Sequence, residues 1–530
     1  MNTSKIVCGC AGRRPSYRSY SSSVIGRIVF ESCVAAYAVT AEKIMKNMIT
    51  IFVLLISPEK YRAMFDKNYN LWYNSTVAKI IMKRLFDQSK RLILVIGDIS
   101  MLYLALYLAL MTRYGKEFTP AIWNDHLFPF TISFVMWIAL FYVAGLYERR
   151  TAANNYAFYS SVVTTVTTAL IATIVLFYLI PAFGITPKTN LIAMGMIFFV
   201  LFLAWRHSYN ALIRSSHLLH PTMFIGSNKE MRAVIEHIRA HPQFGYHAAM
   251  IVEHPRDAQE LIDLIQEYDI DTLVYAQHDT ENGGTSSMSK ILYALFPLGI
   301  TIVDLPTFYA RVTNKIPVSI IGEVWFFENL IESEKSFFET EKRVFDIACA
   351  FIGSIIALPF LPLITILIRI DSTGPIFYTQ LRMGKNNVPF RLVKFRTMVK
   401  NAEQGGVQWT QAKDTRITKI GRFLRKTRID ELPQFWNVLK GDMSFVGPRP
   451  ERPEFVAKLE QEIPHYQMRH LVKPGLTGWA QIHQPLGGAS VEDSIEKLQY
   501  DLYYIKNRSF IIDLDILAKT VLVILRREGR

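Results

Sequence analysis

The sequence predicts a multi-domain membrane protein, in which a four-helix transmembrane bundle precedes an α/β Rossmann-like cytoplasmic domain and an α-rich domain with a re-entrant membrane helix. Three observations predict it. Half of the 530 residues are hydrophobic. Four apolar segments follow one another in the first half of the chain, and a fifth, broken by prolines, precedes a polar, motif-rich C-terminal region. The formal net charge of +14 favours anionic partners such as phosphates, nucleotides and the cytoplasmic membrane surface, and the long apolar segments favour a membrane protein over one that binds nucleic acid.

The four apolar segments each have about the 20 residues that a membrane-spanning helix needs. They lie at 92–112, 128–147, 159–181 and 190–208. Lys and Arg cluster before the first, between the second and third, and after the fourth, so the positive-inside rule places both ends of a bundle at 82–215 in the cytoplasm. Asp98 lies inside the first segment. It either binds a lipid head group or an ion, or faces the bundle beside a polar partner, and we favour the partner.

Residues 1–81 do not fit this organisation. They are basic and Ser-rich, and their apolar runs are too short to span a bilayer. We interpret them as a poorly ordered extension or as the result of a mis-set translation start, since the sequence from Met82 is a more ordinary beginning.

Helices and short apolar strands alternate at 216–335, which predicts a parallel α/β sheet. Only Gly226 is present where a dinucleotide-binding G-x-G-x-x-G loop needs three glycines. We therefore expect a regulatory or oligomerising domain rather than a cofactor site, and homo-oligomerisation is one expectation.

The fifth apolar segment, 342–370, has basic residues at both ends, and Pro359 and Pro362 interrupt it at mid-depth. Similar charge on both flanks favours a re-entrant hairpin that dips into one leaflet, with Pro359 at the break. The alternative is a kinked fifth crossing, which would place the rest of the chain outside.

The region 336–530 combines a carboxylate pair with many cations. Asp430 and Glu431 stand side by side in the stretch Arg428–Pro450. Such a pair suits Mg²⁺, which binds one or two carboxylates together with substrate phosphates. The side chains that would neutralise phosphate oxygens are Lys394, Arg396, Arg425, Arg428 and Arg449. These residue types predict phosphate chemistry.

These motifs carry a resemblance. Asp-Glu followed by Leu-Pro-Gln, Asn-Val-Leu, Gly-Asp-Met-Ser and Gly-Pro-Arg-Pro is similar to the catalytic domain of the monotopic phosphoglycosyl transferases, the bacterial sugar transferase family. The likeness covers about 342–530. With the bundle and the degenerate α/β domain, the chain resembles the large members that begin O-antigen, capsule or exopolysaccharide repeat units with glucose or galactose.

The resemblance implies roles for several residues. Asp430 would attack the β-phosphate of a UDP-sugar, release UMP and pass the phosphosugar to undecaprenyl phosphate, while Glu431 would help to hold Mg²⁺. The substrate-binding residues would be Lys394, Arg396, Arg425, Arg449 and Asp513, with Asp501 as a support for Asp513. Lys342, Arg343 and Asp346 match the cytoplasmic start of the hairpin, where cations would meet inner-membrane lipids. Ser354 lacks the following proline that the family often has.

Three alternatives stay open. A membrane-bound nucleotide-sugar-modifying enzyme needs the glycine loop that is missing here. A non-enzymatic assembly or regulatory factor leaves the carboxylate pair without a purpose. A glycosyltransferase that uses an Asp-x-Asp metal site would match Asp269/Asp271 or Asp513/Asp515, although so short a pattern is common by chance.

Overall fold

The computed structural model describes residues 76–147, 156–180, 188–213, 219–276, 285–330, 336–399, 402, 414–484 and 490–525. The predictions for residues 1–75 lie outside this range. Within it, five helical stretches are long and apolar enough to cross a membrane. Four of them are α4 (Thr76–Tyr114), α5 (Pro120–Val143), α6 (Tyr156–Leu179) and α7 (Lys188–Ile213).

These four helices share one aromatic-rich core. Trp137 and Phe141 of α5 pack on Phe198 and Phe202 of α7, and all four side chains are buried. The indole N–H of Trp137 donates to the hydroxyl of Thr173 on α6 at 2.8 Å. The second helix begins eight residues before the predicted segment because Thr119 and Pro120 form its N-terminus.

Asp98 has the polar partner that we favoured. Its Oδ2 lies 2.6 Å from the Nη2 of Arg206 on α7, and both side chains are buried. Arg206 also donates to the backbone carbonyl of Leu146, the residue that follows α5 by three positions. A buried charge needs such a partner, so the pair joins two helices and the α5 end.

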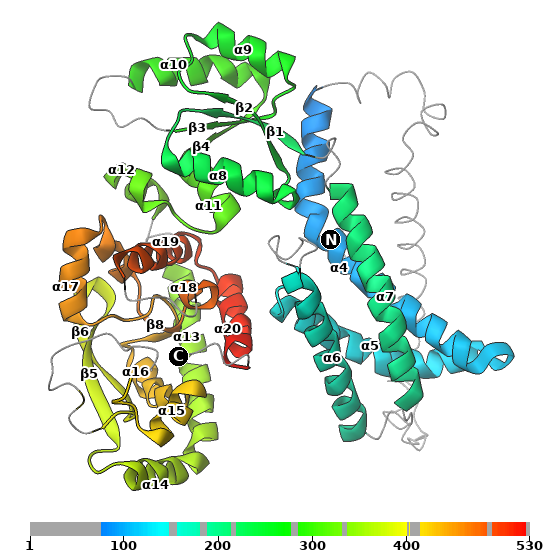
Figure 1. Cartoon of the computed structure of the whole chain (residues 1–530), viewed down its shortest axis with the longest axis vertical. Coiled ribbons are helices and arrows are strands. Elements are labelled where there is room, and N and C mark those ends of the chain that lie inside the picture. Colours follow the sequence, from blue (N-terminus) through cyan, green and yellow to red (C-terminus); the bar gives the residue numbers. More distant parts are fainter. Residues whose placement is uncertain are drawn as a thin grey trace, which may run out of the picture. The chain divides into compact units, whose positions relative to one another are not determined.

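The α/β domain has a four-stranded parallel sheet, as predicted (Figure 1). Its order is β2-β1-β3-β4, built from β1 (His220–Ile225), β2 (Tyr246–Val252), β3 (Thr272–Tyr275) and β4 (Thr301–Asp304). Helices α8 (Lys229–Ala240) and α11 (Leu305–Thr313) cover one face. Helices α9 (Ala258–Glu267) and α10 (Thr285–Leu295) cover the other.

The C-terminal domain is α-rich and holds two small sheets. One is the antiparallel pair β5 (Phe377–Met383) and β6 (Pro389–Phe395), and the other is the parallel pair β7 (Ser444–Val446) and β8 (Gly475–Thr477). Its helices after the apolar segment are α15 (Lys419–Lys426), α16 (Gln434–Lys440), α17 (Pro453–Glu462), α18 (Trp479–His483), α19 (Val491–Asn507) and α20 (Phe510–Leu525).

The fifth apolar stretch is two helices, α13 (Ser336–Ala357) and α14 (Leu361–Asp371), separated by the 3-10 turn Leu358–Phe360. Pro359 lies in this turn, and α14 runs in a different direction from α13 (Figure 1). Ser354 satisfies its hydroxyl locally by donating to the carbonyl of Ala350. The helix is therefore interrupted where the prolines predict it.

The helices α13 and α14, which we call the apolar hairpin, both pack on the C-terminal domain. On α13, Gly353 lies against the ring of Phe435 from α16, where an added Cβ would come within 2.7 Å. On α14, Ile364 and Ile368 pack with Phe395 and Leu424. The outer faces carry exposed apolar side chains, including Phe351, Ile352, Ile355, Ile356, Leu358 and Leu363. An apolar surface this large needs an apolar partner such as lipid.

The charged residues near the start of α13 contact other parts of the protein. Arg343 donates to the carbonyls of Val438 and Leu439, which lie near the C-terminal end of α16. Lys342 pairs with Asp513, and Asp346 accepts from the backbone N–H of Phe445. These residues fix the hairpin to the domain, so the role at lipid phosphates that the resemblance implies stays a prediction.

Candidate active site

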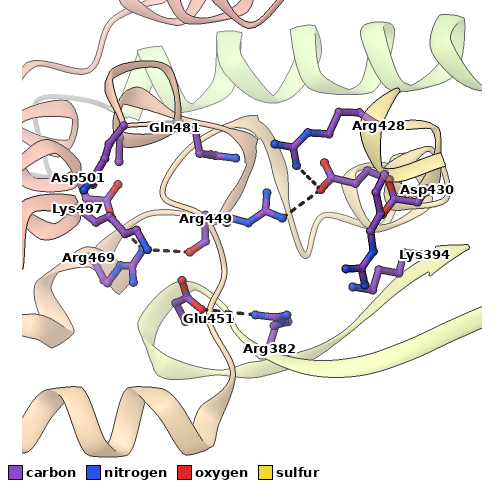
Figure 2. Close-up of a pocket in the computed structure, with 14 residues that line it drawn as sticks. Arg382, Lys394, Arg428, Asp430, Arg449, Glu451, Arg469, Gln481, Lys497 and Asp501 are labelled. Carbon is purple, nitrogen blue, oxygen red and sulfur yellow. Dashed lines mark hydrogen bonds and ion pairs between the residues drawn. The ribbon is translucent and has the colours of Figure 1, made fainter. Parts of the chain in front are cut away.

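A pocket of about 300 Å³ lies in the C-terminal domain, with the carboxylate pair at one end (Figure 2). Its lining comes from β5, β6, α15, the Asp-Glu turn, the Gly-Pro-Arg-Pro turn, α18 and α19. The charged side chains in the lining are Arg382, Lys394, Arg425, Arg428, Asp430, Glu431, Arg449, Glu451, Arg469, Lys497 and Asp501. Seven cations therefore face four carboxylates, as suits a polyanionic ligand.

Asp430 and Glu431 lie in a single 3-10 turn, Ile429–Glu431, between α15 and α16. Arg428 precedes it with a φ of 57°, in the left-handed region that a non-glycine residue rarely adopts. This reversal ends α15 and directs the two carboxylates into the pocket. Strained backbone of this kind is typical of functional sites.

The two carboxylates differ in their surroundings. Asp430 is 6% exposed, and its Oδ1 has no hydrogen-bond partner. Burial, together with the charge of Glu431, raises the pKa of Asp430 to about 6. Burial also acts on Glu431, but Arg449 and Arg428 outweigh it and hold the pKa of Glu431 below its usual value. Asp430 is therefore the less stabilised anion of the pair.

The cations beside the pair are firmly placed. Arg428 and Arg449 both donate to Oε1 of Glu431, at 3.2 Å and 3.1 Å. Arg425 is oriented by a 2.8 Å bond from its Nε to the hydroxyl of Thr397. Burial and the nearby guanidinium groups lower the pKa of Lys394 to about 8. This crowding of positive charge would be relieved by a bound phosphate.

Two arginine side chains hydrogen-bond to the backbone of the turn that carries Arg449. Its own carbonyl accepts from the buried Arg469 at 3.0 Å, and the carbonyl of Pro450 accepts from Arg382 at 3.0 Å. Arg469 in turn lies 2.8 Å from Asp501. The Arg449 side chain is 47% exposed, and its Nη2 lies 3.1 Å from Oε1 of Glu431. Hydrogen bonds to the backbone thus hold the turn that presents Arg449 to the pocket.

Two predicted site residues lie outside this pocket. Arg396 donates to the carbonyls of Ser372 and Thr373, just beyond the C-terminal end of α14, so it ties the hairpin to the domain. Asp513 is buried and pairs with Lys342 and with the hydroxyl of Tyr504. Asp501 contacts Arg469 rather than supporting Asp513. The substrate-binding roles of Arg396 and Asp513 stay predictions, and their contacts in the structure are with protein.

The placement of Asp513 predicts that it stabilises the fold. Replacing Asp513 with Asn would leave Lys342 as an unpaired buried charge, which costs about 3–5 kcal/mol in unfolding free energy. Asp263→Asn is the matched control, because Asp263 is exposed on α9 and accepts from Gln259 one turn away at 2.9 Å, a contact worth less than about 0.5 kcal/mol. We expect a clearly lower melting temperature for Asp513→Asn alone. Equal melting temperatures with a loss of substrate binding would instead place Asp513 at the substrate.

Sequence reasoning missed part of the lining. The lining residues that it missed lie on separate elements. Arg382 is on β5, Glu451 follows the Gly-Pro-Arg-Pro turn, Arg469 is on the 3-10 helix Tyr466–Leu471, Lys497 is on α19 and Gln481 is on α18. Only the motif around Gln481, V-K-P-G-L-T-G-W-A-Q-I, carried a recognisable signal. Isolated charged residues on separate elements give no pattern until the fold brings them together.

The Asp-x-Asp patterns do not form a metal site in the pocket. Asp271 is 2.9 Å from His220 in the α/β domain, Asp513 is buried against Lys342, and Asp515 pairs with Lys519. The described residues contain no group of three or more His, Cys, Asp or Glu side chains that could hold a metal ion. Asp430 and Glu431 still fit Mg²⁺, because Asp430 has an unpartnered oxygen and Mg²⁺ takes substrate phosphates and waters as its other ligands.

The fold and pocket define a class: a domain with an apolar hairpin and a cation-lined carboxylate pair. Residues 337–527 match the family model described as bacterial sugar transferase. The chain is 55% identical over 128 residues to a putative undecaprenyl-phosphate N-acetylgalactosaminyl 1-phosphate transferase of Bacillus subtilis, covering 24% of this chain and 72% of that protein. The chain belongs to the bacterial sugar transferase family.

Two further relatives show the range of names. The UDP-N-acetylgalactosamine-undecaprenyl-phosphate N-acetylgalactosaminephosphotransferase of Aeromonas hydrophila is 47% identical over 188 residues, covering 36% of this chain and 44% of that protein. The UDP-glucose:undecaprenyl-phosphate glucose-1-phosphate transferase of Klebsiella pneumoniae is 32% identical over 310 residues, covering 56% of this chain and 66% of that protein. This chain thus spans less than half of the first and about two thirds of the second.

Proposed function

We propose that this protein transfers sugar 1-phosphate from a UDP-sugar to undecaprenyl phosphate and so initiates the synthesis of a polysaccharide repeat unit. The observation that carries the proposal is the buried Asp430, which lines a cation-rich pocket in a domain with an exposed apolar hairpin. The pocket suits a nucleotide diphosphate, and the hairpin suits a lipid-borne acceptor. The names of the relatives are consistent with both substrates.

The chemistry takes two steps. Asp430, with a pKa of about 6, is mostly ionised at neutral pH and attacks the β-phosphorus of the donor. A bond forms between the carboxylate oxygen and phosphorus, the bond to the bridging oxygen breaks, and UMP leaves. The phosphate oxygen of undecaprenyl phosphate then attacks the same phosphorus and frees Asp430. Each step displaces one oxygen, so no oxidant or reductant is needed.

The cations make this attack feasible. A carboxylate is a weak nucleophile that phosphate oxygens repel, and Lys394, Arg425 and Arg449 oppose that repulsion. Glu431 would act mainly by holding Arg428 and Arg449, since both donate to its Oε1. Asp430 and Glu431 would also hold Mg²⁺, which when bound neutralises phosphate oxygens as a Lewis acid.

The hairpin supports a re-entrant arrangement at the cytoplasmic face of the bacterial inner membrane. Because α13 and α14 pack on one domain on either side of the Pro359 turn, a hairpin that enters and leaves by the same leaflet keeps these contacts. A straight fifth crossing would separate them. UDP-sugars are made in the cytoplasm, so the pocket belongs on that side.

Labelling of single cysteines tests this topology in intact cells. Under re-entry, a cysteine at the exposed Glu454 of α17 stays protected from a membrane-impermeant reagent. A cysteine at the exposed Lys116, in the link between α4 and α5, is labelled. Labelling of both positions from outside would establish a fifth crossing and overturn the cytoplasmic site.

The names of the relatives indicate more than one class of donor sugar. Relatives are named for N-acetylgalactosamine as well as for glucose, so N-acetylated donors belong in the first panel beside glucose and galactose.

Trapping the intermediate tests the proposal. Purified protein with Mg²⁺ and a UDP-sugar labelled on the sugar, but without lipid acceptor, would become labelled in the peptide that contains Asp430. The label would be discharged by undecaprenyl phosphate. Rapid lipid labelling in a complete reaction, with no protein-bound label at any time, would contradict the two-step route and favour direct transfer.

A further inference from the structure

The chain segment that follows the α/β domain is built into the core of the C-terminal domain. After α11 ends, Ile316, Val318 and Trp325 are buried in the same hydrophobic cluster as Leu498 and Tyr504 of α19. The backbone N–H of Ile316 donates to the carbonyl of Gln499 at 3.0 Å. This segment is therefore part of the C-terminal domain, while α11 contributes Leu305, Phe308 and Val312 to the α/β core.

The same segment supports the pocket wall formed by α18. Asn314, with a φ of 58°, ends α11, and its carbonyl accepts from the indole N–H of Trp479 at 3.2 Å. Trp479 is the first residue of α18, whose next two residues, Ala480 and Gln481, line the pocket. A five-residue helix is not stable alone, so its position depends on contacts such as this one.

Lys315 is connected to the pocket through the carboxylate of Glu496. The Nζ of Lys315 lies 2.5 Å from Oε1 of Glu496 and 4.8 Å from the ring centroid of Tyr500. The other oxygen of Glu496 accepts from the amide of Gln484 at 3.1 Å, and Gln484 lines the pocket just after α18. Lys315 thus fixes one end of α18 while Asn314 fixes the other.

We propose that Asn314 and Lys315 are positioning elements of the donor pocket, so that the α/β domain is coupled through α11 to nucleotide binding. The inference rests on the proposed function, since it takes the ligand of this pocket to be the uridine diphosphate portion of the donor. By linkage, nucleotide binding and the state of the α/β domain then influence one another equally. A partner that held or displaced α11 would change donor affinity without touching the carboxylate pair.

The test measures the dissociation constant of UDP, with Mg²⁺, for the full-length protein in lipid nanodiscs by calorimetry. Lys315→Met removes the charge and keeps the stem, and Lys315→Arg preserves the pair. Trp479→Phe removes the donor to Asn314 and keeps a smaller aromatic ring beside Tyr503. A net hydrogen bond corresponds to about a two- to tenfold change in an equilibrium. We expect UDP binding and donor KM to weaken by that factor in Lys315→Met and Trp479→Phe, with kcat nearly unchanged and Lys315→Arg close to wild type.

Arg311→Met is the matched control. Arg311 is an exposed cation on α11 that contacts Tyr246 within the α/β domain, so its loss should leave UDP binding within twofold of wild type. Unchanged UDP binding in Lys315→Met and Trp479→Phe, while wild type transfers sugar phosphate, would overturn the inference and leave the proposed function intact. An equal loss in Arg311→Met would also overturn it. A wild type that binds no UDP would overturn both.

Discussion

Asp430→Asn should abolish sugar-phosphate transfer to undecaprenyl phosphate while leaving the protein folded. Removing a covalent nucleophile typically lowers kcat by about 10⁴- to 10⁶-fold. The melting temperature should be unchanged or higher, because burial of the charged Asp430 carboxylate destabilises the wild-type protein. The same burial raises the pKa of Asp430 to about 6. The measurement is the rate of labelled lipid formation beside a thermal melt.

The same change at Asp263, exposed on α9 of the α/β domain and outside the pocket, is the control and should retain near wild-type transfer. If Asp430→Asn kept even a tenth of the wild-type rate, Asp430 would not be the nucleophile, and its role would be limited to binding or to Mg²⁺.

Gly475→Ala should destabilise the catalytic domain by at least about 3 kcal/mol, because a new Cβ there has no room. The built Cβ would lie 2.1 Å from the backbone nitrogen of Gly447. Gly447 and Gly478 face the same junction of β7 and β8, and a Cβ on either would come within 2.4 Å of backbone oxygen. Backbone cannot move aside as a flexible side chain can, so the Gly-Pro-Arg-Pro turn and Arg449 would shift together.

Chemical denaturation monitored by tryptophan fluorescence measures this effect, with Gly322→Ala as the matched control. A Cβ at Gly322 meets nothing within 4 Å, and its φ of −96° suits alanine. Gly322 is the N-cap of α12, where alanine is less favourable than glycine, so we expect the control to lower stability by less than about 1 kcal/mol. A Gly475→Ala protein as stable as the control would show that the two strands can separate without cost.

Several residues that the sequence grouped around the carboxylate pair line one pocket in the structure. Asp430, Glu431, Arg425 and Arg449 belong to local motifs, so their spacing already places them on a short turn and a stiff Pro-flanked loop. The prolines of the hairpin likewise predicted the break at Leu358–Phe360. The conformation of such turns and helix breaks depends on a few neighbouring residues, and sequence patterns describe chain segments of that length.

Long-range pairing decided the rest. Lys394 lines the pocket, whereas Arg396, two positions later, binds the backbone at the end of α14. No local sequence pattern distinguishes these two cations. Asp513 pairs across 171 positions with Lys342. Arg469 and Asp501 meet behind Arg449 only when α19 packs against the 3-10 helix. The start of α5 was misplaced because the apolar run begins near 128, whereas the helix extends back through the polar residues Asn124, Asp125 and His126 to its N-cap at Thr119.

The nucleotide released during turnover tests the central claim most directly. Wild-type protein in nanodiscs would be mixed with Mg²⁺, undecaprenyl phosphate and each of UDP-glucose, UDP-galactose and UDP-N-acetylgalactosamine, and the products separated by ion-exchange chromatography. The account predicts UMP, one for each diphospho-sugar lipid formed, from at least one donor. Release of UDP would contradict it, because the sugar alone would then have moved and Asp430 could not have carried a phosphosugar.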